Sequence, residues 1–468
     1  MGLRTAPTKD TLSKPAARLP SSARQAALAV LQRVDRGGLA NRVLEMVLSR
    51  GSMDAGERAL TTALVEGVLR NRSWLDFVLA QCCKHPLDSM PPLIVEVLRL
   101  GAFQLLFHER QQDALVVSDS VNLARRCGHE GTAALVNAVL RAVARGHEQI
   151  SPPGLEKDPV AHISVRWSHP QWIVQRWVER FGPEQALLTA RADNEPPDAT
   201  LRVNPLRTDS ATLARDLEEE GLSVQPGPLA PGTLQVRGSA HLVATAAYRN
   251  GSFSLQGAAS VIAGLLASPP RGARVVDMCA GSGGKTTHLA QMMQDRGEIL
   301  ACDVDRRRLS VLKSECERLG ISIVRADQRD ARTLPATEDF DCCLLDAPCS
   351  GTGSLRRRPD IRWHRKEEDL PSLARLQQEL LAAAGGLVKR KGWILYSTCS
   401  LEPEENEHVV AEFLSARPDF RAVDCRPLLP MLGAQDFLME GKAVLLLPHS
   451  HGTDGMFMMR LERTGVHP

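Results

Sequence analysis

The sequence predicts a multidomain α + α/β protein, with an N-terminal all-α bundle, a small α+β linker module and a C-terminal doubly wound domain of seven strands. Three observations support this prediction. The chain has 468 residues, which exceeds a single ordinary core. Apolar residues recur at helical spacing in the front of the chain. After Gln256, apolar strand-like runs alternate with helical stretches to the end of the chain.

Residues 21–147 are expected to be helical throughout. The apolar positions that recur at helical spacing are Leu28, Leu31 and Val34; Leu60, Leu64 and Val68; Ile94, Val97, Leu98 and Leu105; and Leu135, Val139 and Val143. Residues 1–20 are rich in Pro, Ala, Ser and basic residues, so we expect a disordered tail there. Residues 146–158 contain Ser151-Pro152-Pro153-Gly154 and break the helical period, which predicts a linker.

Residues 160–245 predict the small α+β module. Two strand-like runs, Ala199–Val203 and Thr233–Val236, lie on either side of a helical stretch at 209–220. Residues 246–468 form the third predicted domain, and its seven strand-like runs centre on Val275, Ile299, Ile323, Leu344, Ile394, Leu445 and Phe457. Strands alternating with helices indicate a mostly parallel sheet that is covered by helices on both faces.

The composition limits the classes of protein to which the chain can belong. The formal net charge is only +2, so any surface that binds nucleic acid must be local. The 11 cysteines have no regular spacing and form no Cys-x-x-Cys pair, which fits a reducing cytoplasm and predicts no metal site. No stretch approaches the ~18 apolar residues of a membrane span. We therefore expect a cytoplasmic protein that is not embedded in a membrane.

A glycine-rich turn follows the first strand of the third domain, after Asp277. A Walker A loop would require glycine where Cys279 stands, and a dinucleotide fingerprint would require glycine or alanine where Thr286 stands. At the end of the second strand, Asp303 supplies a carboxylate suited to ribose hydroxyls. The loop therefore favours a nucleoside cofactor without a pyrophosphate, such as S-adenosylmethionine (SAM), although such turns are common in doubly wound folds whatever they bind.

Two cysteines follow predicted strands, Cys349 in Asp-Ala-Pro-Cys-Ser-Gly and Cys399 in Tyr-Ser-Thr-Cys-Ser, so both thiols are expected at one rim of the sheet. Methylation of cytosine carbon 5 needs a thiolate that adds to carbon 6, an acid near nitrogen 3 and a base for the carbon-5 hydrogen. Asp346, Cys349 and Cys399 are the residue types required. Spacing alone does not say which cysteine is the nucleophile. A buried, unreactive role is expected for Cys82, Cys83, Cys302, Cys316, Cys342, Cys343 and Cys425.

These motifs, in residues 277–287, 345–353 and 397–407, closely resemble the RNA (cytosine-5)-methyltransferases of the Nol1/Nop2/Sun family. The resemblance implies a Rossmann-like, SAM-dependent methyltransferase domain. It also implies that Cys399 is the nucleophile, that Cys349 assists product release and that Asp346 contacts nitrogen 3. Cofactor contacts are implied for Cys279, Ala280, Gly281, Ser282, Gly283, Gly284, Lys285, Asp303, Asp327 and Asp346.

The front of the chain narrows this resemblance to the bacterial Sun/Fmu, or RsmB, branch. Residues 64–70, 98–105 and 136–141 are similar to the RNA-binding helical domain of NusB, and residues 166–172 and 201–205 also resemble this branch. The resemblance implies an RRM-like linker module and methylation of one cytosine in small-subunit (16S) ribosomal RNA, cytosine 967 in that family. Ribosomal RNA is then the expected partner, and we expect a monomer.

The chain departs from the resembling family in its cofactor loop. Relatives usually read Ala-Ala-Pro-Gly-Gly-Lys, whereas this chain has Gly281-Ser282 in place of Ala-Pro. Replacing proline restores backbone freedom and should loosen the loop, which leaves the effect on SAM affinity open. We expect the chemistry to be retained, because every reacting residue is present.

A basic run at residues 356–366 directly follows the Pro-Cys motif. Such a run is usually a solvated face, but its position beside Cys349 favours phosphate neutralisation near the reacting base. The residues expected to contact RNA are Arg356, Arg357, Arg358, Arg362 and Lys366. Two alternatives stay open: a non-catalytic RNA-binding or antitermination-type factor, and the same chemistry on transfer RNA.

Overall fold

The computed structural model describes residues 22–50, 53–108, 112–237 and 242–465. The chain divides into two compact units, Met1–Ser151 and Pro152–Pro468. The predicted tail at residues 1–20 lies outside the described residues. Among those that are described, no helix is long and apolar enough to cross a membrane, and no group of three or more His, Cys, Asp or Glu side chains could hold a metal ion.

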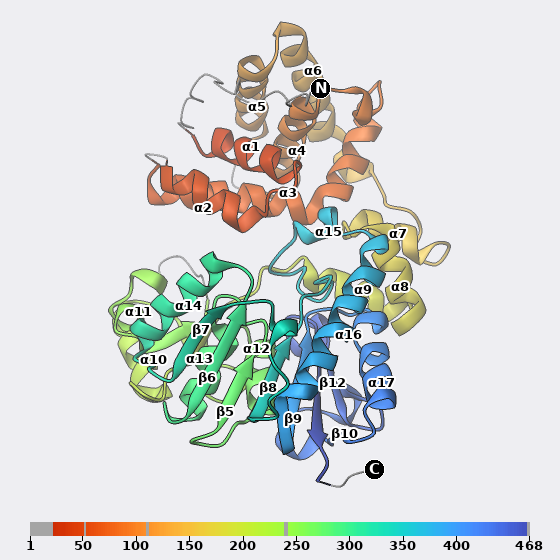
Figure 1. The fold of residues 1–468 in the computed structure, drawn as a ribbon. Helices are drawn as coiled ribbons and strands as arrows, with labels where there is room; N and C mark the ends of the chain where they lie inside the picture. Colours follow the sequence, from red (N-terminus) through yellow and green to blue (C-terminus); the bar gives the residue numbers. More distant parts are fainter. Residues whose placement is uncertain (1–21, 51–52, 109–111, 238–241, 466–468) are drawn as a thin grey trace, which may run out of the picture. The chain divides into compact units, whose positions relative to one another are not determined.

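The first unit is all-α in its described residues, as the sequence predicts (Figure 1). Its helices are α1 (Ala23–Val34), α2 (Ala40–Arg50), α3 (Ala55–Cys82), α4 (Pro92–Phe107), α5 (Asp113–Cys127) and α6 (Glu130–Gly146), with 3₁₀ turns at Leu87–Ser89 and His147–Gln149. Helix α4 forms the centre of this bundle, because α3 and α6 approach it closely. A Cβ at Gly67 of α3 would lie 1.9 Å from the Phe103 ring, and one at Gly101 would lie 2.4 Å from Leu140. These glycines allow close helix packing.

The second unit contains a small antiparallel sheet in the order β2-β3-β1-β4. Its elements are β1 (Ala199–Val203), α10 (Ser210–Glu219), β2 (Val224–Pro226), β3 (Thr233–Val236), the 3₁₀ turn Leu242–Ala244, α11 (Ala246–Arg249) and β4 (Phe253–Leu255). Leu201 on the central strand β1 pairs with Leu234 on one side and Leu255 on the other. Strand β4 therefore belongs to this sheet, although it lies beyond residue 245, where the sequence analysis ends the module.

Three helices precede this sheet: α7 (Pro159–Arg166), α8 (Gln171–Phe181) and α9 (Pro183–Asp193). The sequence predicts that these helices belong to the small module, but Ile173, Trp177 and Ala186 share an apolar core with the large C-terminal sheet. Arg180 of α8 also donates a hydrogen bond of 2.7 Å to the carbonyl oxygen of Leu401. These helices therefore support the segment that follows Cys399.

The large sheet has nine strands, in the order β11-β12-β13-β9-β8-β5-β6-β7 with β10 beside β13 (Figure 1). The strands are β5 (Arg274–Asp277), β6 (Glu298–Asp303), β7 (Val324–Gln328), β8 (Phe340–Asp346), β9 (Val388–Thr398), β10 (Phe420–Ala422), β11 (Phe437–Leu438), β12 (Ala443–Leu446) and β13 (Met456–Arg463). Strands β7, β6, β5, β8 and β9 are parallel, and β13 and β12 continue the sheet antiparallel. All seven predicted strands occur. The short strands β10 and β11 were not predicted.

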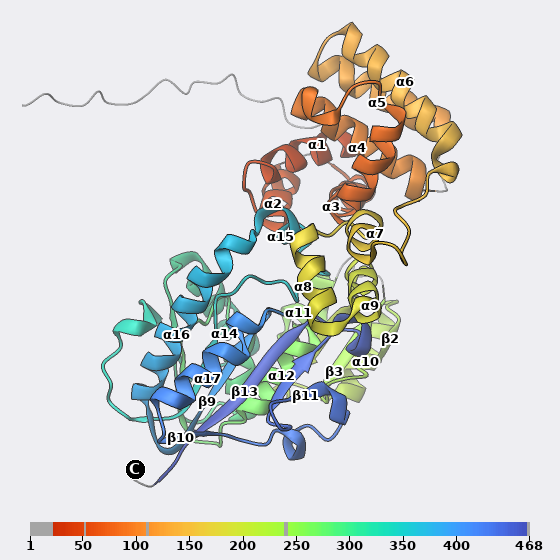
Figure 2. The same ribbon diagram turned by 90° about the vertical axis from the view of Figure 1, so that its right-hand side faces the viewer.

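Alternate residues of the parallel strands enter two separate cores. Val276 and Cys343 face a core that contains α16 (Leu370–Leu387) and α17 (Glu407–Ala416), the helices nearer the viewer in Figure 2. Their neighbours Val275 and Cys342 face the core of α12 (Ala258–Ala267), α13 (Gly284–Met292) and α14 (Arg306–Leu319). Helices on both faces confirm the predicted Rossmann-like architecture. The remaining short elements are α15 (Ile361–His364), α18 (Pro448–His451) and the 3₁₀ turns Ala331–Thr333, Glu367–Asp369, Pro403–Glu405, Arg426–Leu428 and Ala434–Asp436.

Trp177 should contribute strongly to the stability of the second unit. Its side chain is 1% exposed, and its removal leaves a large cavity in the core that α8 shares with the sheet. We expect Trp177→Ala to lower the free energy of unfolding by about 3–5 kcal/mol, measured by calorimetry on the full chain. Trp172 on the same helix is only partly buried, so Trp172→Ala is the matched control with a smaller loss. Equal losses in both variants would contradict this account.

Candidate active site

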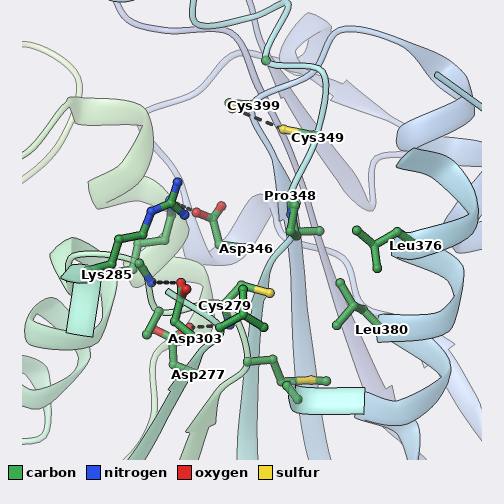
Figure 3. A pocket seen from close by; sticks show the side chains of 18 of the residues that line it. Asp277, Cys279, Lys285, Asp303, Asp346, Pro348, Cys349, Leu376, Leu380 and Cys399 are labelled. Carbon is green, nitrogen blue, oxygen red and sulfur yellow. Dashed lines mark hydrogen bonds and ion pairs between the residues drawn. The ribbon is translucent and has the colours of Figure 1, made fainter. Parts of the chain in front are cut away.

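A cavity of about 710 Å³ lies at the carboxyl ends of the parallel strands. This volume is within the usual range for ligand pockets. It is lined by the loop after β5, by residues 303–304 at the end of β6, by residues 346–351 at the end of β8 and by Cys399 directly after β9. Figure 3 shows Leu376 and Leu380 of α16 on the side opposite Lys285. The cofactor loop and both cysteine motifs therefore meet in one cavity.

The glycine-rich loop is held at its tip by the carboxylate of Asp303. The backbone N–H of Gly281 donates a hydrogen bond of 2.9 Å to Asp303 Oδ2. Gly283 has a φ of +90°, and a Cβ there would lie 2.2 Å from Leu312 Cδ1. Glycine at this position is therefore needed both for the backbone conformation and for the close approach of α14.

The base of the loop is held by Asp277, which ends strand β5. Thr286 Oγ1 donates a hydrogen bond of 2.7 Å to Asp277 Oδ2, and the backbone N–H of Cys279 donates one of 3.3 Å to Oδ1. Burial raises the pKa of Asp277 to about 7, although the bond from Thr286 opposes this shift. Both ends of the turn are thus fixed to the strand that precedes it.

Arg202 of the small module also contacts this loop, which the sequence analysis missed. Its buried guanidinium donates hydrogen bonds to the carbonyl oxygen of Gly284 at 2.7 Å, to Thr287 Oγ1 at 3.0 Å and to Gln291 Oε1 at 3.0 Å. Burial lowers the pKa of Arg202 to about 9. Strand β1 therefore anchors the start of α13, and only the folded structure brings these distant segments together.

The cavity fits a nucleoside cofactor. Of the ten predicted cofactor residues, the cavity is lined by Cys279, Ala280, Gly281, Ser282, Gly284, Lys285, Asp303 and Asp346. Asp303 is suited to ribose hydroxyls, and Val304, Ala331 and Leu380 also line the cavity, where their apolar surface is suited to a purine ring.

Two predicted cofactor residues do not line this cavity. Gly283 lines a separate cavity of about 220 Å³ instead. Asp327 on β7 pairs with Arg329 at 3.2 Å, and it is Arg329 and Asp330 that line the main cavity. The only signal in the sequence for Asp330 is its closeness to Asp327.

Lys285 and Asp346 form an ion pair inside the cavity. Lys285 Nζ lies 2.7 Å from Asp346 Oδ2, and Ser397 Oγ donates a hydrogen bond of 2.9 Å to Oδ1. Burial lowers the pKa of Lys285, but the charge and hydrogen bond of Asp346, together with the charges of Cys399 and Asp277, raise it, and the net shift is upward. The pair places a fixed positive charge and a fixed carboxyl group beside the thiols.

Cys349 and Cys399 lie side by side, with their sulfur atoms 3.3 Å apart (Figure 3). The hydrogen bond from the Cys349 thiol lowers the pKa of Cys399, and the positive charges of Lys285 and Arg358 add to this effect against burial. The same contact and burial raise the pKa of Cys349. Of the eleven cysteines, all within the described residues, Cys399 alone has a lowered pKa. The geometry therefore favours a thiolate on Cys399 and a thiol on Cys349.

The other cysteines mostly have the unreactive surroundings that the sequence predicts. The buried ones are Cys302, Cys316, Cys342, Cys343 and Cys425. Burial raises the pKa of Cys342 to about 12 and that of Cys316 to about 11. The prediction of full burial is wrong for Cys82 and Cys83, which are partly exposed because α3 ends there.

The structure divides the basic run into residues with different surroundings. Arg358 and Lys366 are exposed, and Arg358 lines the cavity. Arg357 forms an ion pair of 2.8 Å with Asp454, and Arg356 donates to backbone carbonyl groups while remaining partly exposed. Arg358 and Lys366 are therefore the members of the run that are most open to a phosphate.

Arg362 does not face solvent, so the prediction that it contacts RNA is wrong. Its side chain is 1% exposed and donates hydrogen bonds to the carbonyl oxygens of Ser168 (3.1 Å) and Asp193 (3.0 Å) and to Asn194 Oδ1 (2.7 Å). The short helix α15 turns this side chain inward, toward acceptors that lie far away in the sequence. Arg365, three residues later, lines the cavity and donates to the carbonyl oxygen of Ser350 at 3.1 Å.

Three protein families match consecutive parts of the chain. The NusB family matches residues 21–145, an RsmF/B-like ferredoxin-like domain matches 169–242, and the family described as 16S rRNA methyltransferase RsmB/F matches 264–462. The probable ribosomal RNA small subunit methyltransferase B of Bacillus subtilis is 33% identical over 451 residues, covering 95% of this chain and 99% of that protein. The chain belongs to the RsmB/F family. A Synechocystis protein of the same name is 31% identical over 447 residues, covering 94% of this chain and 99% of its own length.

Two solved structures share the fold of this chain. The crystal structure of PH0851 matches with a TM-score of 0.78 at 26% identity, over 95% of this chain and 100% of that one. NSun6 from Pyrococcus horikoshii with SFG has the same fold over 64% of this chain and 99% of its own, with a TM-score of 0.57 at 24% identity. As an RsmB/F member, the chain is an RNA methyltransferase that uses SAM. The predicted family, enzyme class and cofactor are confirmed.

Alanine substitutions at two arginines of the basic run should have different effects, one on RNA binding and the other on stability. Arg358→Ala is expected to weaken RNA binding and to reduce the salt dependence of log K by about one, because one exposed phosphate contact is lost. Arg362→Ala is expected to lower the melting temperature instead, because it leaves buried carbonyl groups without a donor. Binding titrations at several salt concentrations, together with calorimetry, measure both effects. A salt dependence that falls only in Arg362→Ala would contradict this assignment.

The pH dependence of alkylation should reveal the thiolate on Cys399. Because the pKa of Cys399 is lowered, its thiolate persists to lower pH, so the midpoint for reaction with iodoacetamide should lie below that of an ordinary cysteine. In Cys349→Ala the hydrogen-bond donor is lost, and the midpoint should rise. Mass spectrometry of the peptide that contains Cys399 follows the reaction. An unchanged midpoint in Cys349→Ala would show that the thiol contact does not set the pKa.

Proposed function

We propose that this enzyme methylates carbon 5 of one cytosine in small-subunit ribosomal RNA through a covalent bond between Cys399 and carbon 6. The observation that carries the proposal is the thiol pair in the cavity, with Cys399 Sγ 3.3 Å from Cys349 Sγ and its pKa lowered. A nucleophilic thiol must be ionised and accessible to its substrate, and these surroundings favour both conditions.

In the proposed reaction the Cys399 thiolate attacks carbon 6 of the cytosine. A sulfur–carbon bond forms, the electrons of the carbon 5–carbon 6 double bond make carbon 5 nucleophilic, and SAM supplies the methyl group that carbon 5 accepts. The carbon-5 proton then passes to solvent, its bonding electrons re-form the carbon 5–carbon 6 double bond, and the sulfur–carbon bond breaks to release the Cys399 thiolate. Cys349 assists this release, since its sulfur lies against that of Cys399.

Asp346 is proposed to contact nitrogen 3 of the cytosine and to donate a proton there as carbon 6 is attacked. Its carboxyl group is fixed by Ser397 and by Lys285, whose ammonium group lies 2.7 Å away. Asp346 is a carboxylate in this ion pair, so the proton that it passes to nitrogen 3 comes from the Lys285 ammonium group, and nitrogen 3 returns the proton by the same route after the methyl group is transferred. The fixed geometry also reduces the reorganisation that the reaction needs.

Ribosomal RNA is proposed as the substrate because the chain aligns along nearly its whole length with proteins named ribosomal RNA small subunit methyltransferase B. The proposed target is the family's cytosine 967. The NusB-like unit and the exposed Arg358 provide surfaces suited to RNA. A non-catalytic role is disfavoured, because Asp346, Cys349 and Cys399 come together at one cavity.

The proposal is tested by incubating the full-length protein with labelled SAM and unmodified small-subunit ribosomal RNA, with transfer RNA in a parallel reaction. Mass spectrometry then maps any 5-methylcytosine. One methylated cytosine in the ribosomal RNA is expected. Methylation of transfer RNA alone would favour that substrate, and methylation at a position other than carbon 5 would overturn the chemistry.

The covalent step can be tested with the two cysteine variants. We expect Cys349→Ala to accumulate a protein–RNA adduct that survives denaturing electrophoresis, because addition proceeds and release is slow. Cys399→Ala should bind RNA without forming any adduct, because the attacking thiolate is missing. A stable adduct in Cys399→Ala would exchange the roles assigned to the two residues.

A further inference from the structure

One buried carboxylate, that of Glu405, contacts the loops that carry both thiols. Its side chain is fully buried at the end of the 3₁₀ turn Pro403–Glu405. Oε1 accepts hydrogen bonds from the backbone N–H of Ser350 at 2.8 Å and from Gln377 Nε2 at 2.9 Å. Oε2 accepts one from Ser400 Oγ at 2.5 Å and another from Ser350 Oγ. Four donors thus surround a carboxylate that has no contact with solvent.

These contacts determine how the two loops lie. Ser350 directly follows Cys349 and Ser400 directly follows Cys399, so a single carboxylate links both cysteine motifs. The two serine hydroxyls also lie 3.1 Å from each other. A buried charge is costly unless several hydrogen bonds satisfy it. The four donors meet that requirement and at the same time fix the separation of the loops.

Glu405 is itself fixed by its neighbours. Tyr396 Oη donates a hydrogen bond of 2.5 Å to the backbone carbonyl oxygen of Glu405. Gln377, which reaches the carboxylate from α16, also donates to the carbonyl oxygen of Pro348 at 2.8 Å. The carboxylate therefore has little freedom to move away from the thiol pair.

We propose that Glu405 is a positioning residue for methyl transfer, which fixes the two thiols against each other and keeps the proton on Cys349 so that Cys399 reacts as the thiolate. This inference rests on the proposed roles of Cys349 and Cys399. Glu405 acts through the two loops and does not itself touch the reacting atoms.

The charges near the two thiols favour a proton on Cys349 and a thiolate on Cys399, as the proposal requires. Besides the bond to Cys399 and burial, the negative charges of Glu405 and Asp346 raise the pKa of Cys349. The groups that act on Cys399 are Cys349, Asp346, Lys285 and Arg358, of which Lys285 and Arg358 favour its thiolate. Tyr396 has its pKa raised by burial and stays a neutral donor, and the Arg365 guanidinium donates to the carbonyl oxygens of Cys349 (3.4 Å) and Ser350 (3.1 Å). Removing the charge of Glu405 should therefore shift the thiolate toward Cys349.

The test is Glu405→Gln, which keeps the size of the side chain but removes its charge and one pair of acceptor sites. We expect kcat for RNA methylation to fall roughly 10- to 100-fold while KM for RNA stays within about threefold. Independently of activity, iodoacetamide labelling at neutral pH without RNA should shift from Cys399 toward Cys349, as measured by mass spectrometry. A purely structural defect would not redirect the label in this way.

Glu402→Gln is the matched control. Glu402 is a buried carboxylate of the same motif, but it pairs with Arg176 at 2.6 Å and contacts neither loop serine through its side chain. The Glu402→Gln variant should therefore leave the ratio of Cys399 labelling to Cys349 labelling unchanged. Ser400→Ala removes one hydrogen-bond donor from Glu405 and keeps the charge of the carboxylate. This variant should lower kcat without shifting the label from Cys399 to Cys349. It also tests the positioning role if Glu405→Gln does not fold.

Two results would overturn the inference: kcat and labelling ratio within about twofold of the wild type in Glu405→Gln, or an equal shift of the label in Glu402→Gln. Wild-type protein that methylates no cytosine would instead refute the proposed function, while the labelling ratio could still be measured. The two failures are therefore distinguishable.

Discussion

The register between β8 and β9 determines the geometry of the whole site. Asp346 lies opposite Ser397 in this parallel pair, and the backbone N–H of Ala347 donates a hydrogen bond of 2.8 Å to the carbonyl oxygen of Ser397. Both chains leave the sheet at this point, so Cys349 and Cys399 begin from neighbouring positions at the same rim. A slip of β9 by one residue against β8 would turn the side chains of β9 to the opposite face and separate the thiols. The two apolar cores prevent this slip, because alternate residues of each strand are buried on both sides of the sheet.

Beyond the sheet, buried polar groups rather than apolar packing hold the loops. Asp303 holds the tip of the cofactor loop, Arg202 holds the start of the following helix, and Glu405 holds both cysteine loops. Hydrogen bonds are directional and are stronger in a medium of low dielectric constant, so they fix loop positions more closely than apolar contacts can. Such networks are also costly when one member is missing. These buried polar groups therefore position the loops of the site accurately, although each of them would destabilise the fold if it were left unpaired.

The predictable parts of this architecture are those that depend on local pattern. Runs such as Arg274–Asp277 have the apolar character and flanking turns of a buried strand, so the sheet, the rim and the meeting of the two thiols follow from sequence. Long-range hydrogen bonding is not encoded locally, which is why Arg362 was expected to face RNA while its acceptors lie near Ser168 and Asp193. For the same reason residues 402–407, which read Glu-Pro-Glu-Glu-Asn-Glu and are strongly acidic, give no sign in the sequence that Glu405 is fully buried.

The unusual Gly281-Ser282 pair can be understood from the same constraints. Loss of proline should widen the conformational range of the loop in the absence of other restraints. Here the N–H of Gly281 bonds to Asp303, and the carbonyl oxygen of Gly284 accepts from Arg202, so both sides of the pair are restrained by buried charged groups. In the unfolded chain, glycine increases the backbone freedom at this position. In the folded state, these two contacts restrict that freedom. The cost of the substitution therefore falls mainly on the free energy of folding.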